Sequence, residues 1–444
     1  MKGPAVFLVV AATVAAAAAA EATRAVLITY EDARPVLETH GKTIAAADWT
    51  AWASARNAQI RARLAQGDED SIVNLWLYGT SFTKLPRVTD SVAARLAGRE
   101  AVEDLLVARL DDFVAALAKP GTDERLRFAR EIVTRRGIDL ATAAGREEAE
   151  VHLVEIRERA IRDERLRAAE PPSARATLYR DRGLSTDTRL TASFAIDRAL
   201  ASLADSGRLR AGTIARIAIV GPGLDFTDKA EGYDFYPLQT IQPFALVDSL
   251  IRLKLAAPGG PRVTTFDLSP RVNGHLAAAR RRAASGTPYT IQLPLPKDQP
   301  QHEWHPDLVA YRGRFGATIG KAVPAVAPPA IAGDVRIRAV AVRPSIVSAV
   351  TPEDVNIIVE RLDPLPDAER FDLIVATNIL VYYDAFEQGL ALANVSSMLK
   401  PGGFFLTNYP VAPLPPMETT ASQTTAVYFD RQQNGDTIYA YQRR

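Results

Sequence analysis

The chain has 444 residues, of which 47% are hydrophobic and 24% are charged, and it contains no cysteine. This length predicts about two or three domains, and the apolar fraction excludes wholesale disorder. Without cysteine there is no disulfide framework, zinc–cysteine site, iron–sulfur cluster or cysteine nucleophile. The net charge of +1 lacks the basic excess that is typical of nucleic-acid-binding proteins. We therefore expect no nucleic acid among the partners.

Residues 1–20 have the pattern of an export signal. A positive charge at Lys2 precedes an uncharged apolar stretch that runs to Ala20. This pattern predicts a signal peptide over 1–20, cleaved near Ala20–Ala22, and a periplasmic or extracellular protein. The alternatives are an uncleaved membrane anchor, or a cytoplasmic protein if the leader is not functional. No later stretch has the length and apolarity of a membrane span, so we expect none beyond an uncleaved leader.

Residues 24–172 are expected to form an all-α domain. Apolar residues recur there at spacings of three and four, which is the period of a helix, in Ala45–Leu64, Ser91–Leu117, Asp123–Arg135 and Gly145–Ala169. Pro171 and Pro172 then end the helical pattern, so we place a domain boundary at 172/173. The aromatic-rich stretch Asn74–Phe82 has two interpretations, a pocket wall or a buried helix–helix contact, and burial of aromatic side chains favours the second.

Residues 173–444 alternate between strand and helix patterns. Short β-branched or apolar runs predict five strands, at Arg216–Val220, Arg262–Phe266, Val355–Val359, Phe371–Ala376 and Phe404–Asn408. Helical spacing predicts helices at Pro243–Leu255 and Asp384–Leu399. The dipeptide Asn434-Gly435 indicates a terminal hairpin. The expected fold class is α/β, a Rossmann-like doubly wound sheet with a C-terminal antiparallel hairpin, preceded by an all-α domain, with ligands at the carboxyl ends of the strands.

Two segments interrupt this pattern. An insertion near 283–351 is rich in proline and contains the strand-like VRIRAVAV at 335–342, so it predicts a small subdomain over the active site or a flap. Its histidines His302 and His305 lack an identifiable third ligand, and we expect no metal site. The second segment, 231–244, carries four aromatic residues that predict a cover over the ligand pocket, namely Tyr233, Phe235, Tyr236 and Phe244.

Four motifs follow one another in the C-terminal part of the chain. They are IVGPG at 219–223, FDL at 266–268, FDLIVATNILVYYD at 371–384 and LKPGGFF at 399–405. In this order they resemble the class I S-adenosylmethionine (SAM) methyltransferase family over roughly residues 210–444. The segment TNILVYYD at 377–384 is similar to the chemotaxis-receptor methyltransferase (CheR-type) branch. The resemblance implies SAM as the cofactor.

The resemblance also implies roles for individual residues. The backbone of Val220, Gly221, Pro222 and Gly223 would approach the cofactor closely, which glycine permits. Asp267, with Leu268 after it, would accept hydrogen bonds from the two ribose hydroxyls. Arg361 and Leu362 would flank the adenine. Asn378 would lie beside the methyl group and its acceptor, and Tyr382 would wall that catalytic site, where a tyrosine face favours a sulfonium cation.

The first motif departs from the family pattern at two positions. Ile219 stands where the family usually has an acid, and Asp225 stands where a third glycine is common. Asp225 or Asp228 is therefore a candidate for part of the cofactor's amino-group contact. No general base is named, because the acceptor, a protein carboxylate or a small molecule, is not indicated by any motif.

Three functions follow from these features. The first is a SAM-dependent methyltransferase. The second is an exported, catalytically inactive binding module with the same fold, which the missing first acid and the leader favour, since SAM is made in the cytoplasm. The third is an NAD-dependent oxidoreductase, which is weaker because GPGLDF at 221–226 lacks the third glycine of G-x-G-x-x-G.

Overall fold

The computed structural model describes residues 24–89, 96, 98–169, 183–188, 190–227, 233–296, 303–412, 414, 417 and 422–444. The predicted signal peptide over 1–20 lies outside these residues. Within the described part of the chain, no helix has the length and apolarity needed to cross a membrane.

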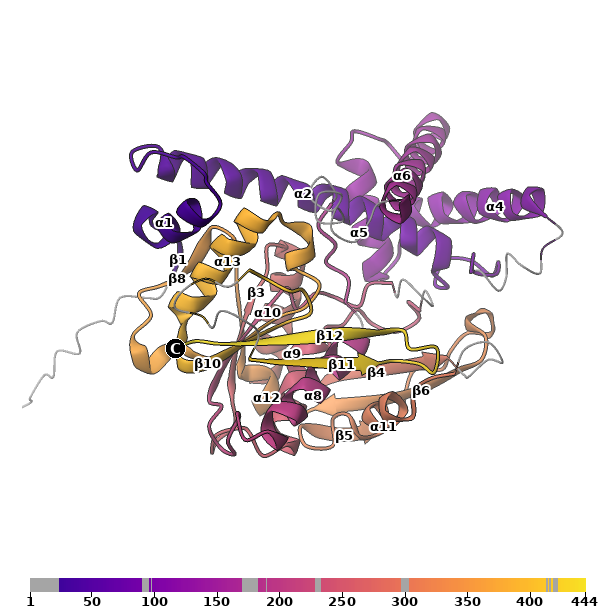
Figure 1. The fold of residues 1–444 in the computed structure, drawn as a ribbon. Helices are drawn as coiled ribbons and strands as arrows, with labels where there is room; N and C mark the ends of the chain where they lie inside the picture. The colour runs from indigo at the N-terminus through magenta and orange to yellow at the C-terminus, as the bar shows by residue number, and fades with distance from the viewer. Residues whose placement is uncertain are drawn as a thin grey trace, which may run out of the picture.

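A seven-stranded mixed sheet forms the centre of the C-terminal part (Figure 1). Its order is β11-β12-β10-β9-β2-β3-β7, with bounds β2 Arg216–Val220, β3 Arg262–Phe266, β7 Val350–Glu353, β9 Phe371–Ala376, β10 Leu399–Thr407, β11 Gln423–Tyr428 and β12 Gly435–Gln442. Strands β7, β3, β2, β9 and β10 pair in parallel, and β12 pairs antiparallel with β10 and β11. The predicted fold class, including the C-terminal antiparallel hairpin, is confirmed.

Helices cover both faces of this sheet. Side chains alternate along β2, so that Ile217 and Ile219 pack on one face while Ala218 and Val220 pack on the other. The first face is covered by α8, α9 and α10, with bounds Leu190–Asp205, Gln242–Arg252 and Pro270–Ala284. The second is covered by α1 and α13, with bounds Tyr30–Thr39 and Ala385–Met398. The strand order reverses beside β2, which makes its carboxyl end a switch point for ligand binding.

One predicted strand is wrong. Residues 355–359 form a buried turn instead, in which the Val359 N–H donates to the Asn356 carbonyl over 3.0 Å. The third parallel strand is β7, which contains Pro352 and lies at the edge of the sheet, where the missing N–H of proline is tolerated. The next strand, β8 (Glu360–Asp363), belongs to a separate antiparallel pair with β1 (Arg24–Leu27).

The region before the sheet is helical, as predicted. It comprises α2 (Trp49–Tyr78), α4 (Arg99–Ala118), α5 (Glu124–Thr134) and α6 (Ala143–Ala169). Helix α2 joins two hydrophobic clusters, since Ala53 and Ile60 pack with the sheet while Ile72 and Trp76 pack with the other helices. The boundary at 172/173 stays a prediction, and the sheet's own core extends into the first half of α2.

The insertion near 283–351 folds into a small antiparallel sheet of order β4-β6-β5. Its elements are β4 Tyr289–Pro296, α11 Pro306–Arg314, β5 Gly320–Val323, the 3-10 turn Ala330–Ala332, β6 Val335–Val342 and α12 Pro344–Ser348. Its apolar side chains, such as Ile291 and Val340, join the core beneath α8 and α9. His305 caps α11 by accepting the Asp307 N–H over 3.2 Å, and His302 lies outside the described residues. Two further 3-10 turns span Asp367–Glu369 and Leu380–Tyr382.

Candidate functional site

A cavity of about 730 Å³ lies at the carboxyl ends of β2, β3 and β9. Its volume falls in the range of small-molecule and cofactor sites, roughly 300–1,000 Å³. The sheet contributes residues at the ends of these strands and directly after them, namely Val220, Gly221, Gly223, Phe266, Asp267, Leu268, Thr377 and Asn378. The cavity therefore brings together the residues of three motifs that the sequence analysis singled out.

Helix α2 and the segment 183–188 form the opposite wall. The Leu184 N–H donates to the Arg63 carbonyl of α2 over 3.1 Å, and the Leu224 N–H donates to the Thr186 carbonyl over 2.8 Å. The segment crosses α2 at Gly67, where an added Cβ would lie 1.9 Å from the Leu184 oxygen. The segment 183–188 thus links α2 to the loop after β2. No motif in the sequence predicted that this segment forms part of the cavity wall.

The stretch Asn74–Phe82 fulfils both of its proposed roles. Asn74 and Tyr78 line the cavity, while Leu75 and Trp76 are buried against the other helices. Two faces of one helix thus contact two different environments, which explains why the sequence left both interpretations open.

The loop after β2 requires glycine at two positions. Gly221 has φ +65° and Gly223 has φ +62°, and both lie in the left-handed region. A Cβ on Gly223 would also lie 2.6 Å from the Thr186 carbonyl oxygen. The loop is therefore fixed by backbone geometry as well as by packing. Pro222, between the two glycines, is not among the residues that line the cavity.

Asp267 follows β3 and is buried in the cavity wall. Its Oδ1 accepts the Ser269 N–H over 2.8 Å. Burial raises the pKa of Asp267 to about 7, although hydrogen bonds from the Ser269 and Gly223 backbone and the nearby Arg271 oppose this shift. A ligand that donates hydrogen bonds to the carboxylate would favour its ionised form.

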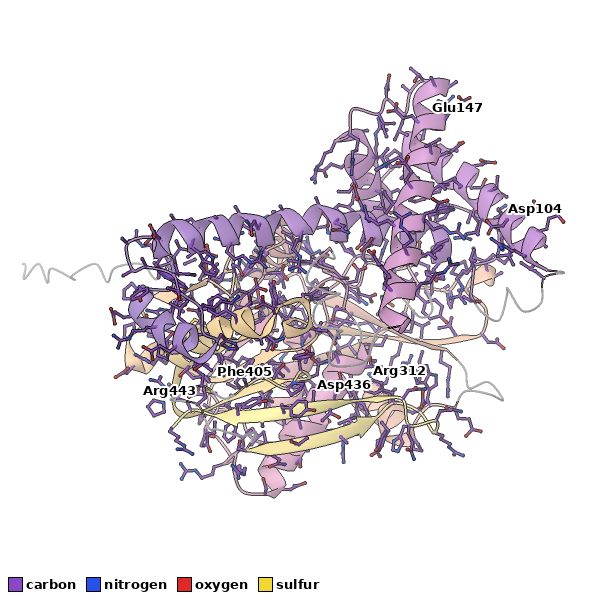
Figure 2. The ribbon with its side chains drawn as sticks, turned by 45° about the horizontal axis from the view of Figure 1, so that its top comes forward. Asp104, Glu147, Arg312, Phe405, Asp436 and Arg443 are labelled. Atoms are coloured by element: carbon purple, nitrogen blue, oxygen red, sulfur yellow. The ribbon has the colours of Figure 1, made fainter. Side chains whose placement is uncertain are left out.

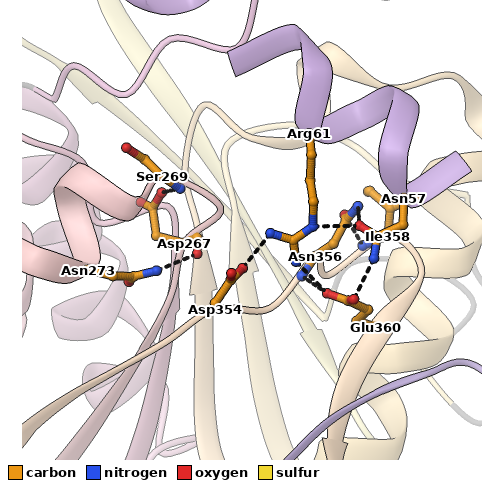
Figure 3. Close-up of polar contacts among 9 residues, drawn as sticks. All are labelled: Asn57, Arg61, Asp267, Ser269, Asn273, Asp354, Asn356, Ile358 and Glu360. Atoms are coloured by element: carbon orange, nitrogen blue, oxygen red, sulfur yellow. Dashed lines mark hydrogen bonds and ion pairs between the residues drawn. The ribbon is translucent and has the colours of Figure 1, made fainter. Parts of the chain in front are cut away.

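The turn after β7 is held in the cavity wall by α2 (Figure 3). The Arg61 guanidinium donates from Nη1 to Asp354 Oδ1 over 2.6 Å and from Nη2 to Glu360 Oε2 over 3.0 Å. Asn356 Nδ2 donates to Asn57 Oδ1 over 2.9 Å, and Asn356 N donates to Glu360 Oε2 over 2.7 Å. These contacts place Val355, Asn356 and Ile357 in the lining, beside Asp267.

Arg361 and Leu362 lie outside this lining, on β8. Arg361 Nη2 forms an ion pair with Asp32 Oδ2 of α1 over 2.7 Å, and Leu362 is buried in the core. The expectation for Arg361 and Leu362 was wrong because the third parallel strand is β7 and not 355–359. The residues that follow this strand are therefore those of the turn at 354–357. The sequence analysis missed this turn as a cavity wall because it assigned it to a strand.

Asn378 follows β9 and anchors a chain of amide contacts. It has φ +59°, which is uncommon for a residue other than glycine and occurs often at functional sites. Asn378 N donates to Asn408 Oδ1 over 2.8 Å, and Asn408 Nδ2 donates to Asn378 Oδ1 over 2.7 Å and to Asp436 Oδ2 over 2.9 Å. Tyr382 also lines the cavity.

Asp436, at the start of β12, is a site residue that the sequence analysis missed (Figure 2). Burial raises the pKa of Asp436, while hydrogen bonds from Asn408 and the Thr437 N–H oppose the shift. Phe429, at the other arm of the hairpin, lines the cavity as well. The Asn434-Gly435 signal predicted the hairpin. The sequence did not indicate that Phe429 and Asp436 line the cavity, because they are far in sequence from the other motifs.

Asp225 is turned away from the cavity. Its Oδ2 accepts the Tyr236 hydroxyl over 2.9 Å and Gln239 Nε2 over 2.7 Å, and its side chain is buried. Asp228 lies outside the described residues. The four aromatic residues predicted to cover the pocket do not line it, because three pack with one another and the fourth joins the core, namely Tyr233, Phe235, Tyr236 and Phe244.

No protein-family model and no curated protein matches the chain. Among solved structures, the chain is similar to the N-methyltransferase NodS from Bradyrhizobium japonicum WM9, at 11% identity and TM-score 0.24, over 56% of this chain and 93% of that chain. It is also similar to the SAM-bound magnesium protoporphyrin IX methyltransferase ChlM from Synechocystis PCC 6803, at 11% identity and TM-score 0.28, over 64% and 97%. A SAM complex of the glycopeptide N-methyltransferase MtfA aligns at 13% identity and TM-score 0.23, over 56% and 76%. Identities and TM-scores this low make them weak likenesses.

Proposed function

We propose that the protein is a SAM-dependent methyltransferase. The observation that carries this proposal is that three features line one cavity at the switch point of the sheet. They are the turn with Gly221 and Gly223, the carboxylate of Asp267, and Asn378 with its positive φ. These residues come from three motifs far apart in the sequence. Their meeting in one site supports a shared ligand, and the motif resemblance implies that this ligand is SAM.

The described residues fit this cofactor. The Asp267 carboxylate is positioned to accept hydrogen bonds from the two ribose hydroxyls, and the glycines leave room for a close backbone approach. Val355, Asn356 and Ile357 line the cavity and would flank the adenine in place of Arg361 and Leu362. We call Gly221, Gly223, Asp267 and the turn 355–357 the cofactor end of the cavity.

When bound, SAM would supply an electrophilic methyl carbon to the acceptor's lone pair, and the electron pair of the broken C–S bond would stay on sulfur. Positioning and exclusion of water account for most of what the protein must contribute to such a transfer. Tyr382 and Tyr383 line the wall next to Asn378. The face of Tyr382 can stabilise a sulfonium, whereas the Tyr383 ring already has the Arg63 guanidinium over it. We call Asn378, Phe429 and Asp436 the acceptor end of the cavity.

Isothermal titration of the purified chain with SAM, S-adenosylhomocysteine and NAD tests the proposal. We expect both adenosyl ligands to bind and Asp267→Ala to abolish their binding, because the ribose loses its acceptor. The control Asp104→Ala removes an exposed carboxylate on α4, far from the sheet (Figure 2), and should leave binding unchanged. Absence of SAM binding at millimolar concentration, or unchanged binding in Asp267→Ala, would contradict the proposal.

One observation favours the binding-module alternative. Because the Asp225 carboxylate accepts hydrogen bonds from Tyr236 and Gln239, it does not replace the acid that the family usually places before the first glycine. If neither SAM nor NAD binds, this alternative gains support. We further propose that residues 1–20 direct export, and fusing residues 1–25 to a reporter that works only outside the cytoplasm tests it.

A further inference from the structure

The lining of the cavity has a one-sided charge. Among its described residues are three carboxylates, Asp187, Asp267 and Asp436, and no lysine, arginine or histidine. A cavity walled by carboxylates and aromatic rings attracts cations and disfavours anions. The cofactor end and the acceptor end of the cavity differ in whether a cation lies close to the carboxylate. This difference indicates which chemical class of acceptor the cavity can bind.

At the cofactor end, a cation lies behind the carboxylates. Arg271 of α10 donates to Thr186 Oγ1 over 2.7 Å and interacts electrostatically with both Asp187 and Asp267. A second cation, Arg63, lies behind the wall next to Asn378, where it donates to the Tyr382 carbonyl over 3.1 Å and lies over the Tyr383 ring. Neither guanidinium forms a contact with Asp436 in the described residues.

At the acceptor end, Asp436 makes no ion pair with any described residue. Its oxygens accept hydrogen bonds from Asn408 Nδ2 over 2.9 Å and from the Thr437 N–H over 3.1 Å. A carboxylate oxygen has more than one lone pair, so Asp436 keeps acceptor capacity toward the cavity. The same Asn408 amide group also donates to Asn378 Oδ1 over 2.7 Å, which fixes two acceptor oxygens relative to each other.

We propose that the acceptor is an amine, and that its nitrogen binds against the Asp436 carboxylate and the Asn378 side-chain oxygen. This inference rests on the methyltransferase function proposed above. An ammonium gains a charge-assisted hydrogen bond from Asp436, whereas a carboxylate acceptor would be placed beside an unpaired like charge. The bound nitrogen gives one proton to Asp436, its lone pair forms the C–N bond, and the C–S bond breaks with its electrons on sulfur.

A pair of cofactor analogues tests this subsite without knowledge of the acceptor. In sinefungin a carbon that bears an ammonium replaces the methyl-bearing sulfur of SAM, so that the ammonium takes the place of the methyl group, while S-adenosylhomocysteine has an uncharged sulfur and no group there. We expect Asp436→Asn to weaken sinefungin binding about tenfold, and S-adenosylhomocysteine binding less than about twofold, in isothermal titration. The control Asp104→Asn removes the same charge from an exposed position and should change neither affinity.

Each result has a defined meaning. Retained S-adenosylhomocysteine binding shows that Asp436→Asn is folded, so an unchanged ratio of the two affinities would overturn the amine proposal and leave the methyltransferase function intact. An equal loss of both ligands would make Asp436 a structural residue and would also overturn the proposal. If the unsubstituted protein binds neither ligand, the methyltransferase function itself fails.

Discussion

The two ends of the cavity are built in different ways. The cofactor end is braced from three directions, by Arg61 of α2, by Ser269 after β3 and by Thr186 of the crossing segment. The acceptor end depends on one amide pair, Asn378 and Asn408, and on a carboxylate from the C-terminal hairpin. If the proposed function holds, this difference implies that affinity for the nucleoside and choice of acceptor depend on separable parts of the fold.

Gly223→Ala should break the cofactor end most severely. Alanine at φ +62° is strained, and its Cβ would lie 2.6 Å from a backbone oxygen that cannot move away alone. We expect S-adenosylhomocysteine affinity to fall about 100-fold, measured by titration. Gly212→Ala is the matched control, because Gly212 has φ +70° but open space around it. Gly212→Ala should lower the free energy of unfolding by about 1 kcal/mol and leave S-adenosylhomocysteine affinity unchanged. Equal losses of affinity in both variants would contradict the importance of the close contact between Gly223 and Thr186.

The ionisation of Asp267 should make the cofactor end sensitive to pH. Its pKa of about 7 lies above the ordinary 3.8, so between these values the folded protein holds a proton that the unfolded chain releases. The free energy of unfolding of the ligand-free protein therefore falls as pH rises through this window. The ionised carboxylate accepts ribose hydrogen bonds, so S-adenosylhomocysteine affinity should rise about tenfold from about pH 6 to about pH 8.

Asp267→Asn is the control for this pH dependence. Asp68, whose pKa burial raises to about 6, titrates nearby and is unchanged in that variant. Any pH dependence that Asp267→Asn retains therefore belongs to other groups. A full tenfold rise in the variant would remove Asp267 from the explanation, and a flat profile in the unsubstituted protein would do the same.

The sequence predicted the cofactor end better than the acceptor end. Strands β2, β3 and β9 and helix α13 could be predicted because each is an apolar or β-branched pattern bounded by turn or cap signals, such as the Asp384 N-cap at the start of α13. The third strand was misplaced because Pro352 weakens the strand pattern of β7, whereas the apolar run at 355–359 is buried without pairing. Asp436 was missed because its place depends on the long-range pairing of β12 with β10.

Arg61→Ala should weaken S-adenosylhomocysteine binding at the cofactor end less than Gly223→Ala does. The substitution removes the contacts of Arg61 with Asp354 and Glu360, but Asn57 of α2 and Glu360 still hold Asn356. Since the Arg61 pairs are partly exposed, we expect about fivefold weaker S-adenosylhomocysteine binding. Arg135→Ala breaks an exposed ion pair with Glu131 on α5 and should have no effect. An effect of equal size there would indicate a nonspecific loss of charge.

The smallest expected effect is the coupling between a substitution at the cofactor end and one at the acceptor end. It tests most directly whether the two ends of the cavity are independent. Arg61 and Asp436 share no contact partner in the described residues, and each belongs to a different end of the cavity. The sinefungin binding free energies lost in Arg61→Ala and in Asp436→Asn should therefore add in the double variant, to within about 0.5 kcal/mol. A coupling well above this value, measured by titration of all four proteins, would mean that the turn after β7 and the hairpin form one cooperative unit. The acceptor end would then not be a separable part of the site, and affinity and acceptor choice would be linked.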